Sequence, residues 1–196
     1  MPTSLSDSTV SRRIVLGLTG ASGMPYAIRL WHVLAATPDI ELHAIVSDAA
    51  VRVLALESDT SINVLLSLAY RVYPIADVGA PPGSGSWPHY GMVVCPCSMA
   101  SLAAIAHGLG SNLIHRAADV TLKERRPCIL VPRETPYNAV HLRNMIAAHE
   151  AGATILAASP GFYRRPDSIV ELVDGIVGHI LDLLDIEQQL VAHWKG

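Results

Sequence analysis

The sequence carries little charge and has no hydrophobic run long enough for a membrane span. Only 16% of its residues are charged and 51% are hydrophobic, yet no apolar stretch reaches the ~20 residues that cross a bilayer. Residues 1–12 are polar and rich in serine, without the apolar core of a secretory signal. We therefore expect a cytoplasmic protein whose excess apolar surface is covered by contacts between copies of the chain.

Cysteines and metal-binding patterns are equally sparse. The chain has three cysteines, Cys95, Cys97 and Cys128. An odd number of cysteines in a chain without an export signal argues against a disulfide framework. None of the nine histidines falls in an H-E-x-x-H or Cys-x-x-Cys…His pattern, so we expect no metal. The net charge of -3 and the scattered Lys and Arg leave no basic patch for nucleic acid.

Short apolar runs alternate with amphipathic segments, which is typical of a mostly parallel sheet covered by helices on both faces. We predict an α/β fold of the doubly wound, Rossmann-like type, with ligands beyond the carboxyl ends of the strands. Residues 1–12 are expected to be a disordered tail and residues 13–196 a single domain. The predicted strands are residues 14–18, 41–46, 91–95, 128–132 and 154–157; the predicted helices are residues 25–36, 49–56, 98–107, 112–124, 139–150 and 168–184.

The first predicted strand runs into a glycine-rich turn, Gly20-Ala21-Ser22-Gly23. Free backbone N–H groups and a serine hydroxyl at a helix start predict an anion site, although an ordinary tight turn has the same sequence pattern. This is not a dinucleotide fingerprint, because G-x-G-x-x-G is absent and Ser47, not an acid, follows the second strand.

A second turn of this kind follows the strand at residues 91–95, where Ser98 can cap the next helix. Farther along, Arg116, Asp119 and Lys123 share one stripe of a predicted helix, a pattern that also suits a solvated face. Two loops rich in Gly, Pro and Ser, residues 77–87 and 158–166, are either connectors or site loops.

One more charged pair follows the strand at residues 128–132. An arginine and a glutamate at a site edge, here Arg133 and Glu134, can clamp a phosphate and move a proton.

Between Ile14 and Trp194 these motifs resemble those of the UbiX-type flavin prenyltransferases. The matching segments are residues 20–23, 84–86, 97–99, 116–126, 131–136, 160–163 and 181–182. The resemblance implies that FMN binds at a subunit interface, with a dodecamer as the family precedent, and that dimethylallyl phosphate donates its five-carbon group to flavin N5 and then C6 without a metal. The product would serve a downstream decarboxylase that depends on prenylated FMN.

The resemblance also assigns roles to individual residues. The residues implied for FMN are Gly20, Ala21, Ser22, Ser47, Ser98, Met99, Ser101, Arg116 and Arg133. Those implied for the prenyl phosphate are Ser84, Gly85, Ser86, Lys123, Tyr163, His179 and Trp194, and those implied for catalysis are Ser22, Lys123 and Glu134. Aromatic faces such as Tyr163 and Trp194 can stabilise the electron-poor allylic fragment.

His179 departs from the family pattern, which has Arg or Lys at this position. Either other cations suffice for the phosphate, or the chain is a non-catalytic FMN carrier associated with a decarboxylase. The motifs leave open a monophosphate or a diphosphate donor. An FMN-dependent cysteine decarboxylase is disfavoured, because the P-A-S-A-N-T and P-x-M-N segments of those enzymes are missing.

Overall fold

Six parallel strands form one sheet within residues 11–192, the part of the chain that this computed structural model describes. Their order is β3-β2-β1-β4-β5-β6, so the chain winds from β1 to one edge of the sheet and then from β4 to the other. The strands are β1 Arg12–Leu18, β2 Ile40–Val46, β3 Arg71–Tyr73, β4 Gly91–Cys97, β5 Cys128–Pro132 and β6 Thr154–Ile155. The predicted doubly wound α/β fold is confirmed, and all of these strand pairings are parallel.

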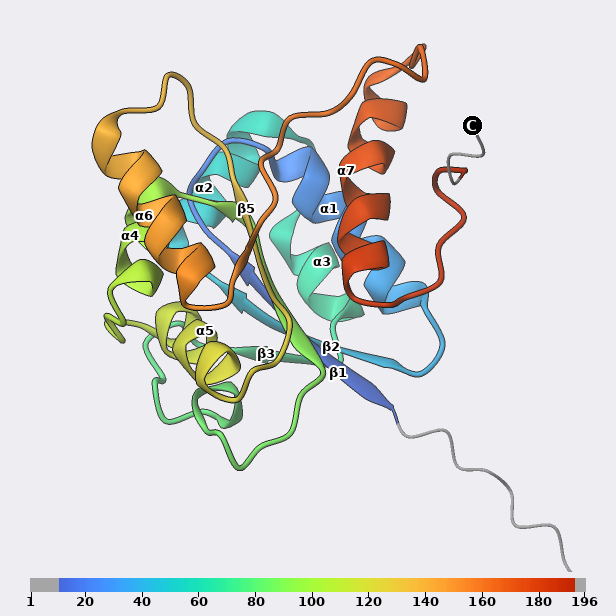
Figure 1. Ribbon diagram of the computed structural model, residues 1–196. Helices are drawn as coiled ribbons and strands as arrows, with labels where there is room; N and C mark the ends of the chain where they lie inside the picture. Colours follow the sequence, from blue (N-terminus) through green and yellow to red (C-terminus); the bar gives the residue numbers. More distant parts are fainter. Residues whose placement is uncertain (1–10, 193–196) are drawn as a thin grey trace, which may run out of the picture.

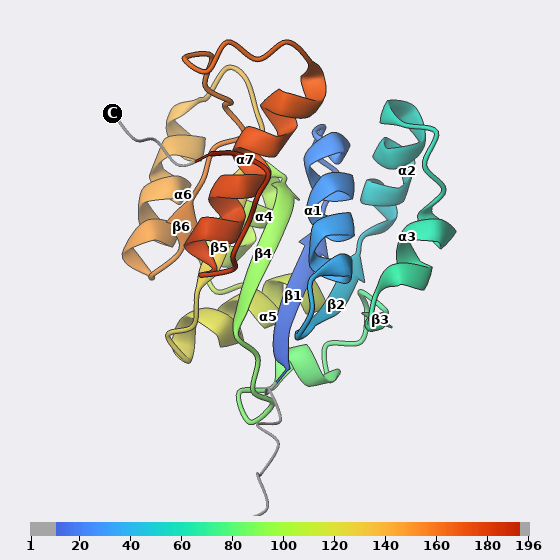
Figure 2. The same ribbon diagram turned by 90° about the vertical axis from the view of Figure 1, so that its right-hand side faces the viewer.

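Helices cover both faces of the sheet (Figures 1 and 2). One layer contains α1, α2, α3 and α7, and the other contains α4, α5 and α6. The helices are α1 Met24–Ala36, α2 Asp48–Glu57, α3 Ile62–Leu68, α4 Met99–Ala106, α5 Leu113–Lys123, α6 Ala139–Glu150 and α7 Ile169–Leu183, with a short 3-10 turn, η1, at Pro81–Gly83.

The sheet separates two hydrophobic cores. Successive strand residues point to opposite faces, so Leu16 packs with α1 and α7 whereas its neighbour Val15 packs with α4 and α5. Both side chains are fully buried. Burial on both faces explains why the strands appear in the sequence as continuous apolar runs instead of alternating patterns.

Polar caps fix the helix starts that face the carboxyl edge of the sheet. The hydroxyls of Ser47 and Ser98 accept the backbone N–H of Ala50 and Ser101 at the starts of α2 and α4. We predicted that three helices begin at Ser98, Asn112 and Ser168. In the structure each of these residues is the N-cap, and the helix begins at the next residue. Such caps satisfy N–H groups that a helix cannot pair internally.

The structure corrects several boundaries. Arg12, assigned to the tail, is the first residue of β1 and pairs with Ile40. Helix α3 and strand β3 were not predicted at all. The last predicted strand, residues 154–157, is only two residues long.

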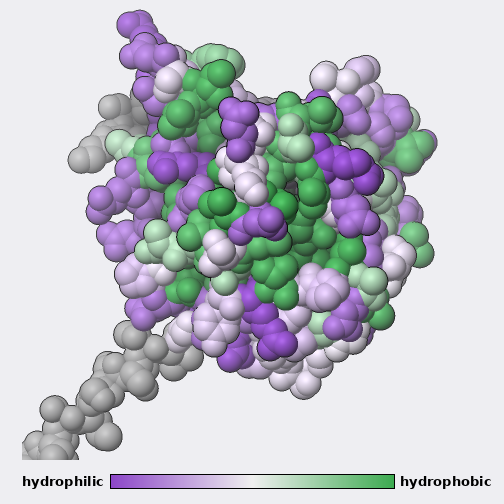
Figure 3. All heavy atoms as spheres, turned by 180° about the vertical axis from the view of Figure 1, so that it is seen from behind, coloured by the Kyte–Doolittle hydropathy of each residue, from purple (hydrophilic) through white to green (hydrophobic). Residues whose placement is uncertain are grey.

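The face formed by α2, α3 and β3 carries hydrophobic residues near its centre (Figure 3). The exposed large apolar residues on these elements and on the short connection between α3 and β3 are Val51, Leu56, Val64, Leu68, Tyr70 and Val72. Within residues 11–192, no helix is long and apolar enough to cross a membrane.

Candidate functional site

The turns after β1, β4 and β5 meet at the carboxyl edge of the sheet. Thr19 Oγ1 donates to the Pro96 carbonyl at 2.7 Å and accepts the Ser98 N–H at 2.8 Å, which ties the first two turns together. Arg133, just after β5, donates from Nε to the Ser22 carbonyl at 3.1 Å. The structure therefore brings Ser22, Ser98 and Arg133, three of the residues predicted to bind FMN, together at one edge of the sheet.

The turn after β2 joins this group through a close approach at Gly20. A Cβ at Gly20 would lie 2.5 Å from the Ala49 Cβ, so no larger residue fits without moving α2. Ser47 accepts the Ala50 N–H at 3.0 Å, which leaves its own O–H able to donate to a ligand. We call the group of Ser22, Ser47, Ser98 and Arg133 the cradle.

The start of α1 is not the free anion site that we predicted. The Glu57 carboxylate, at the end of α2, accepts the N–H groups of Gly23 and Met24 at 2.9 and 2.8 Å. Burial alone would raise the pKa of Glu57, but hydrogen bonds from the Ser22 hydroxyl and these two N–H groups, with the nearby Arg133 charge, lower it below its ordinary value. A carboxylate of the protein thus already occupies the positive end of this helix.

A chain of polar side chains leads inward from the cradle. The Ser98 hydroxyl donates to Ser101 Oγ at 3.2 Å, and His115 Nε2 lies 3.2 Å from the same oxygen. His115 Nδ1 lies 2.9 Å from the Ser111 hydroxyl. Burial lowers the pKa of His115, so the ring is held neutral and serves as a hydrogen-bonding support for Ser101.

The donors of the cradle fit a flavin phosphate. The terminal nitrogens of Arg133 make no hydrogen bond within residues 11–192, and a guanidinium fork with free donors suits phosphate oxygens. The Ser47 hydroxyl faces the same edge, and the close packing at Gly20 keeps the turns compact. Arg133 and Ser47 would hold the phosphate, and Ala21, which is buried, belongs to the same set of turns.

Lys123 and residues 84–86 do not lie in the cradle. Lys123 ends α5 and the loop precedes β4, so both lie at the opposite edge of the sheet, where the strands begin (Figure 2). A Cβ at Gly85 would lie 2.6 Å from Lys123 Nζ, and the Ser84 and Ser86 hydroxyls are 2.9 Å apart. We call residues 84–86 the serine loop; Lys123 also hydrogen-bonds Glu124.

Tyr163 and His179 form a third group. They line a groove of about 1130 Å³ beside α7, which also contains Asp182, Leu190 and Val191. The Tyr163 ring is 68% exposed and stacks under the Arg164 guanidinium at 5.6 Å. Trp194 lies outside the described residues, two positions beyond the groove residue Ala192.

The remaining predicted residues lie at the margins of these groups. Arg116 donates to the Gly83 carbonyl at 3.2 Å and pairs with Asp119 at 2.8 Å, so it faces η1 and not the cradle of its own chain. Glu134 is exposed and accepts the Thr135 N–H at 2.9 Å. Met99 follows Ser98 at the start of α4.

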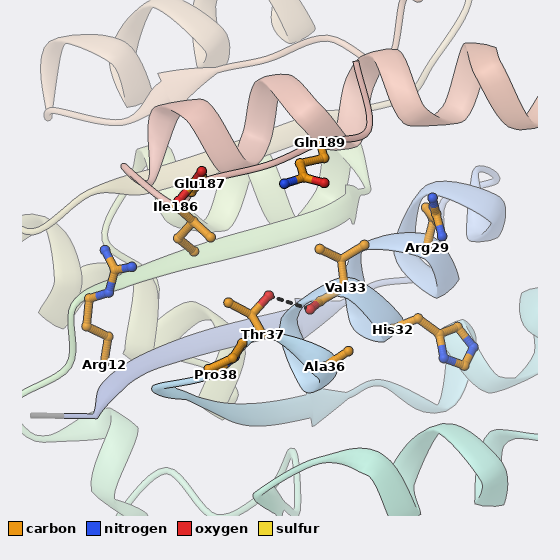
Figure 4. A pocket seen from close by; sticks show the side chains of 10 residues that line it. All are labelled: Arg12, Arg29, His32, Val33, Ala36, Thr37, Pro38, Ile186, Glu187 and Gln189. Atoms are coloured by element: carbon orange, nitrogen blue, oxygen red, sulfur yellow. Dashed lines mark hydrogen bonds between the residues drawn. The ribbon is translucent and has the colours of Figure 1, made fainter. Parts of the chain in front are cut away.

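A separate cleft of about 920 Å³ lies between the end of α1 and residues 186–189 (Figure 4). Its Arg29 is held by Asp174 at 2.6 Å, and Arg12 donates to the Asp185 carbonyl at 2.9 Å. None of the predicted site residues within residues 11–192 lines this cleft. In the same part of the chain, no three His, Cys, Asp or Glu side chains are grouped to hold a metal.

Sequence reasoning missed Glu57 and His115. Glu57 lies far along the chain from Ser22, as His115 does from Ser101, and nothing in the local pattern separates Glu57 from an ordinary helix-end residue. His115 follows the Asn112 cap in the first turn of α5, which is too common a position to be a signal.

Comparisons with known proteins identify the family of this chain. The Flavoprotein family matches residues 2–193. Flavin prenyltransferase LpdB of Lactiplantibacillus plantarum is 45% identical over 185 residues, which cover 94% of this chain and 99% of that protein.

Two solved structures are similar throughout. The crystal structure of a dodecameric FMN-dependent UbiX-like decarboxylase from Escherichia coli O157:H7 has a TM-score of 0.91 and 37% identity, covering 94% of this chain and 100% of that one. AnUbiX (PadA1) in complex with FMN and dimethylallyl pyrophosphate has a TM-score of 0.90 and 42% identity, covering 94% and 98%. The chain therefore belongs to the flavoprotein family and, within it, to the flavin prenyltransferases.

Proposed function

We propose that this protein transfers a dimethylallyl group from dimethylallyl phosphate to reduced FMN, breaking the allylic C–O bond, forming bonds at N5 and C6 and releasing inorganic phosphate. The observation that carries the proposal is the cradle itself, with free Arg133 donors and hydroxyls at one sheet edge, in a chain 45% identical to flavin prenyltransferase LpdB. When bound, reduced FMN supplies the electron-rich atoms that accept the prenyl group. The product would pass to a separate decarboxylase.

Residues of the cradle would hold the flavin and accept the proton that bond formation at C6 releases. Arg133 and Ser47 would bind the flavin phosphate. Ser22 would lie beside the reacting ring. Its hydroxyl hydrogen-bonds the Glu57 carboxylate, which orients it. A carboxylate with a lowered pKa is ionised at neutral pH and can take a proton through that hydroxyl. Exposed Glu134 is the second candidate base.

The prenyl phosphate residues would come from two copies of the chain. Lys123 and the serine loop lie at the far edge of the sheet from the cradle, so they would serve the cradle of a neighbouring copy. The exposed apolar residues on α2 and α3 provide surface for such contacts, and the E. coli relative is dodecameric.

Complementation tests this shared site. Lys123→Ala and Arg133→Gln should each abolish or strongly reduce prenylation in a uniform assembly. Dissociating and reassembling the two variants together should restore activity, because some sites then combine an intact Lys123 with an intact Arg133. A mixed assembly as inactive as its components would refute a site shared between copies.

The decisive experiment for the function is the mass of the flavin. The protein is incubated anaerobically with reduced FMN and dimethylallyl phosphate, and the released flavin is analysed for the mass gain of one dimethylallyl unit. Dimethylallyl diphosphate is tested in parallel. Unmodified FMN from both reactions would favour the alternative, a non-catalytic FMN carrier, for which the specific observation is that the groove contains His179 where the family has Arg or Lys.

A further inference from the structure

The serine loop is held from one side by a single guanidinium. Arg126 lies three residues after the end of α5 and donates from Nη2 to the Gly85 carbonyl at 3.1 Å and from Nη1 to the Trp87 carbonyl at 3.2 Å. Its own N–H donates to the Thr121 carbonyl at 2.9 Å, which fixes it to the last turn of that helix. Arg126 therefore connects the loop to the segment that carries Lys123.

His89 completes this connection and its protonation state follows from the geometry. Arg126 Nη1 lies 2.8 Å from His89 Nδ1, and because a guanidinium has no acceptor, Nδ1 must be the bare nitrogen. The other nitrogen, Nε2, then donates to Thr121 Oγ1 at 2.8 Å, and that hydroxyl donates to the Ala117 carbonyl at 2.6 Å. The 6% exposed ring is thus neutral and fully paired.

The same loop is clamped from the side of β1 and β2. The Trp87 ring makes an edge contact with His43 at 4.9 Å and lies 5.6 Å from the His89 ring. Arg13 lies over Trp87 at 5.3 Å and donates to the Pro88 carbonyl at 3.3 Å. The loop backbone is therefore held at the carbonyls of Gly85, Trp87 and Pro88, and Gly85 lies next to the Lys123 ammonium group.

We infer that Arg126 and His89 are positioning residues that align the serine loop with Lys123 to form one anion-binding group for the donor phosphate. Neither side chain is assigned a contact with the phosphate: Arg126 hydrogen-bonds the carbonyls of the loop, and His89 accepts a hydrogen bond from Arg126. Because Gly85 packs against Lys123 and its hydrogen-bonded partner Glu124, a shift of the loop changes its position relative to Lys123. The inference rests on the proposed function, in which this group binds the prenyl phosphate.

The adjacent Arg125 provides a matched control. It is exposed, has no side-chain partner within residues 11–192, and carries the same charge one residue away. We expect Arg126→Ala to raise the KM for dimethylallyl phosphate by about tenfold or more, the equivalent of one lost charge-assisted contact. FMN affinity and kcat at saturating donor should change little, and Arg125→Ala should leave all three constants near their wild-type values.

A second variant and a second measurement separate this inference from the proposed function. His89→Leu keeps Arg126 but removes its support, and should raise the same KM. Hydrogen exchange of residues 84–90 should accelerate in both variants and not in Arg125→Ala, whether or not the protein prenylates FMN. An unchanged KM together with unchanged exchange in folded Arg126→Ala or His89→Leu protein would overturn the inference, whereas absence of wild-type prenylation would count only against the proposed function.

Discussion

Acid should destabilise this protein through His89. Burial, followed by the Arg126 charge, lowers the pKa of His89 from 6.5 to about 4; His43 acts in the same direction, and the Trp87 backbone and Glu124 oppose it. The folded state therefore resists a proton that the unfolded chain accepts, so the contribution is present above pH 6.5 and is lost as the pH falls towards 4. His89 Nδ1 accepts the hydrogen bond from Arg126. A protonated ring has no acceptor nitrogen, so protonation would break this hydrogen bond.

The size of the effect follows from the shift. The difference between 6.5 and about 4 corresponds to about 3 kcal/mol when fully developed, and linkage gives a loss of about 2 kcal/mol between pH 7 and pH 5. The assay is urea unfolding between about pH 4.5 and pH 7.5, a range that lies around these two pKa values. The protein concentration is kept fixed, because assembly of subunits also contributes to stability.

Variants identify the source of the loss. His89→Gln removes the titrating ring and should flatten the pH dependence by about 2 kcal/mol between pH 7 and pH 5, although it lowers stability at pH 7. His32→Gln is the control, because His32 lies on the exposed side of α1. If wild type and His89→Gln lost equal stability on acidification, the neutral, Arg126-bound state of His89 would be refuted.

Three further predictions concern ligands. The protein should bind FMN and not NAD in a fluorescence titration, and Arg133→Gln should weaken FMN by about tenfold or more, because a charge-assisted hydrogen bond to phosphate is lost; equal NAD binding would contradict the cradle assignment. Glu134→Gln should leave FMN bound but slow prenylation, as judged by flavin mass over time, and unchanged turnover would remove Glu134 from the reaction. His179→Arg should lower the KM for the donor, because a guanidinium offers a permanent charge and a fork of donors to phosphate oxygens; an unchanged donor KM would place His179 outside the phosphate site.

The parts of the fold that sequence could predict are those with strong periodic signals. Long apolar runs bounded by turns located β1, β2, β4 and β5, and amphipathic segments located six of the helices within residues 11–192. Strand β3 was missed because three residues with two charged or aromatic side chains give no run, and α3 because its seven residues follow a polar turn. Pairing with β2 and packing on α1 decide those two elements.

The site was predictable only in part for a similar reason. Parallel strands end at one edge, so the grouping of Ser22, Ser98 and Arg133 followed from order alone. The same order implies that Lys123, before β5, lies at the other edge, which the sequence interpretation did not take into account. The Glu57 contact depends on how α2 packs against α1, and no local pattern encodes it.

Glu57 also changes how the cradle can evolve or be redesigned. In many phosphate sites the ligand is held by peptide groups at a helix start, which no substitution can remove. Here that position is taken by the protein's own carboxylate, so under the proposed function the flavin phosphate would be recognised by side chains such as Arg133 and Ser47. Either side chain can be substituted on its own while Glu57 still accepts the N–H groups at the start of α1. Ligand preference can therefore change without a change in the backbone.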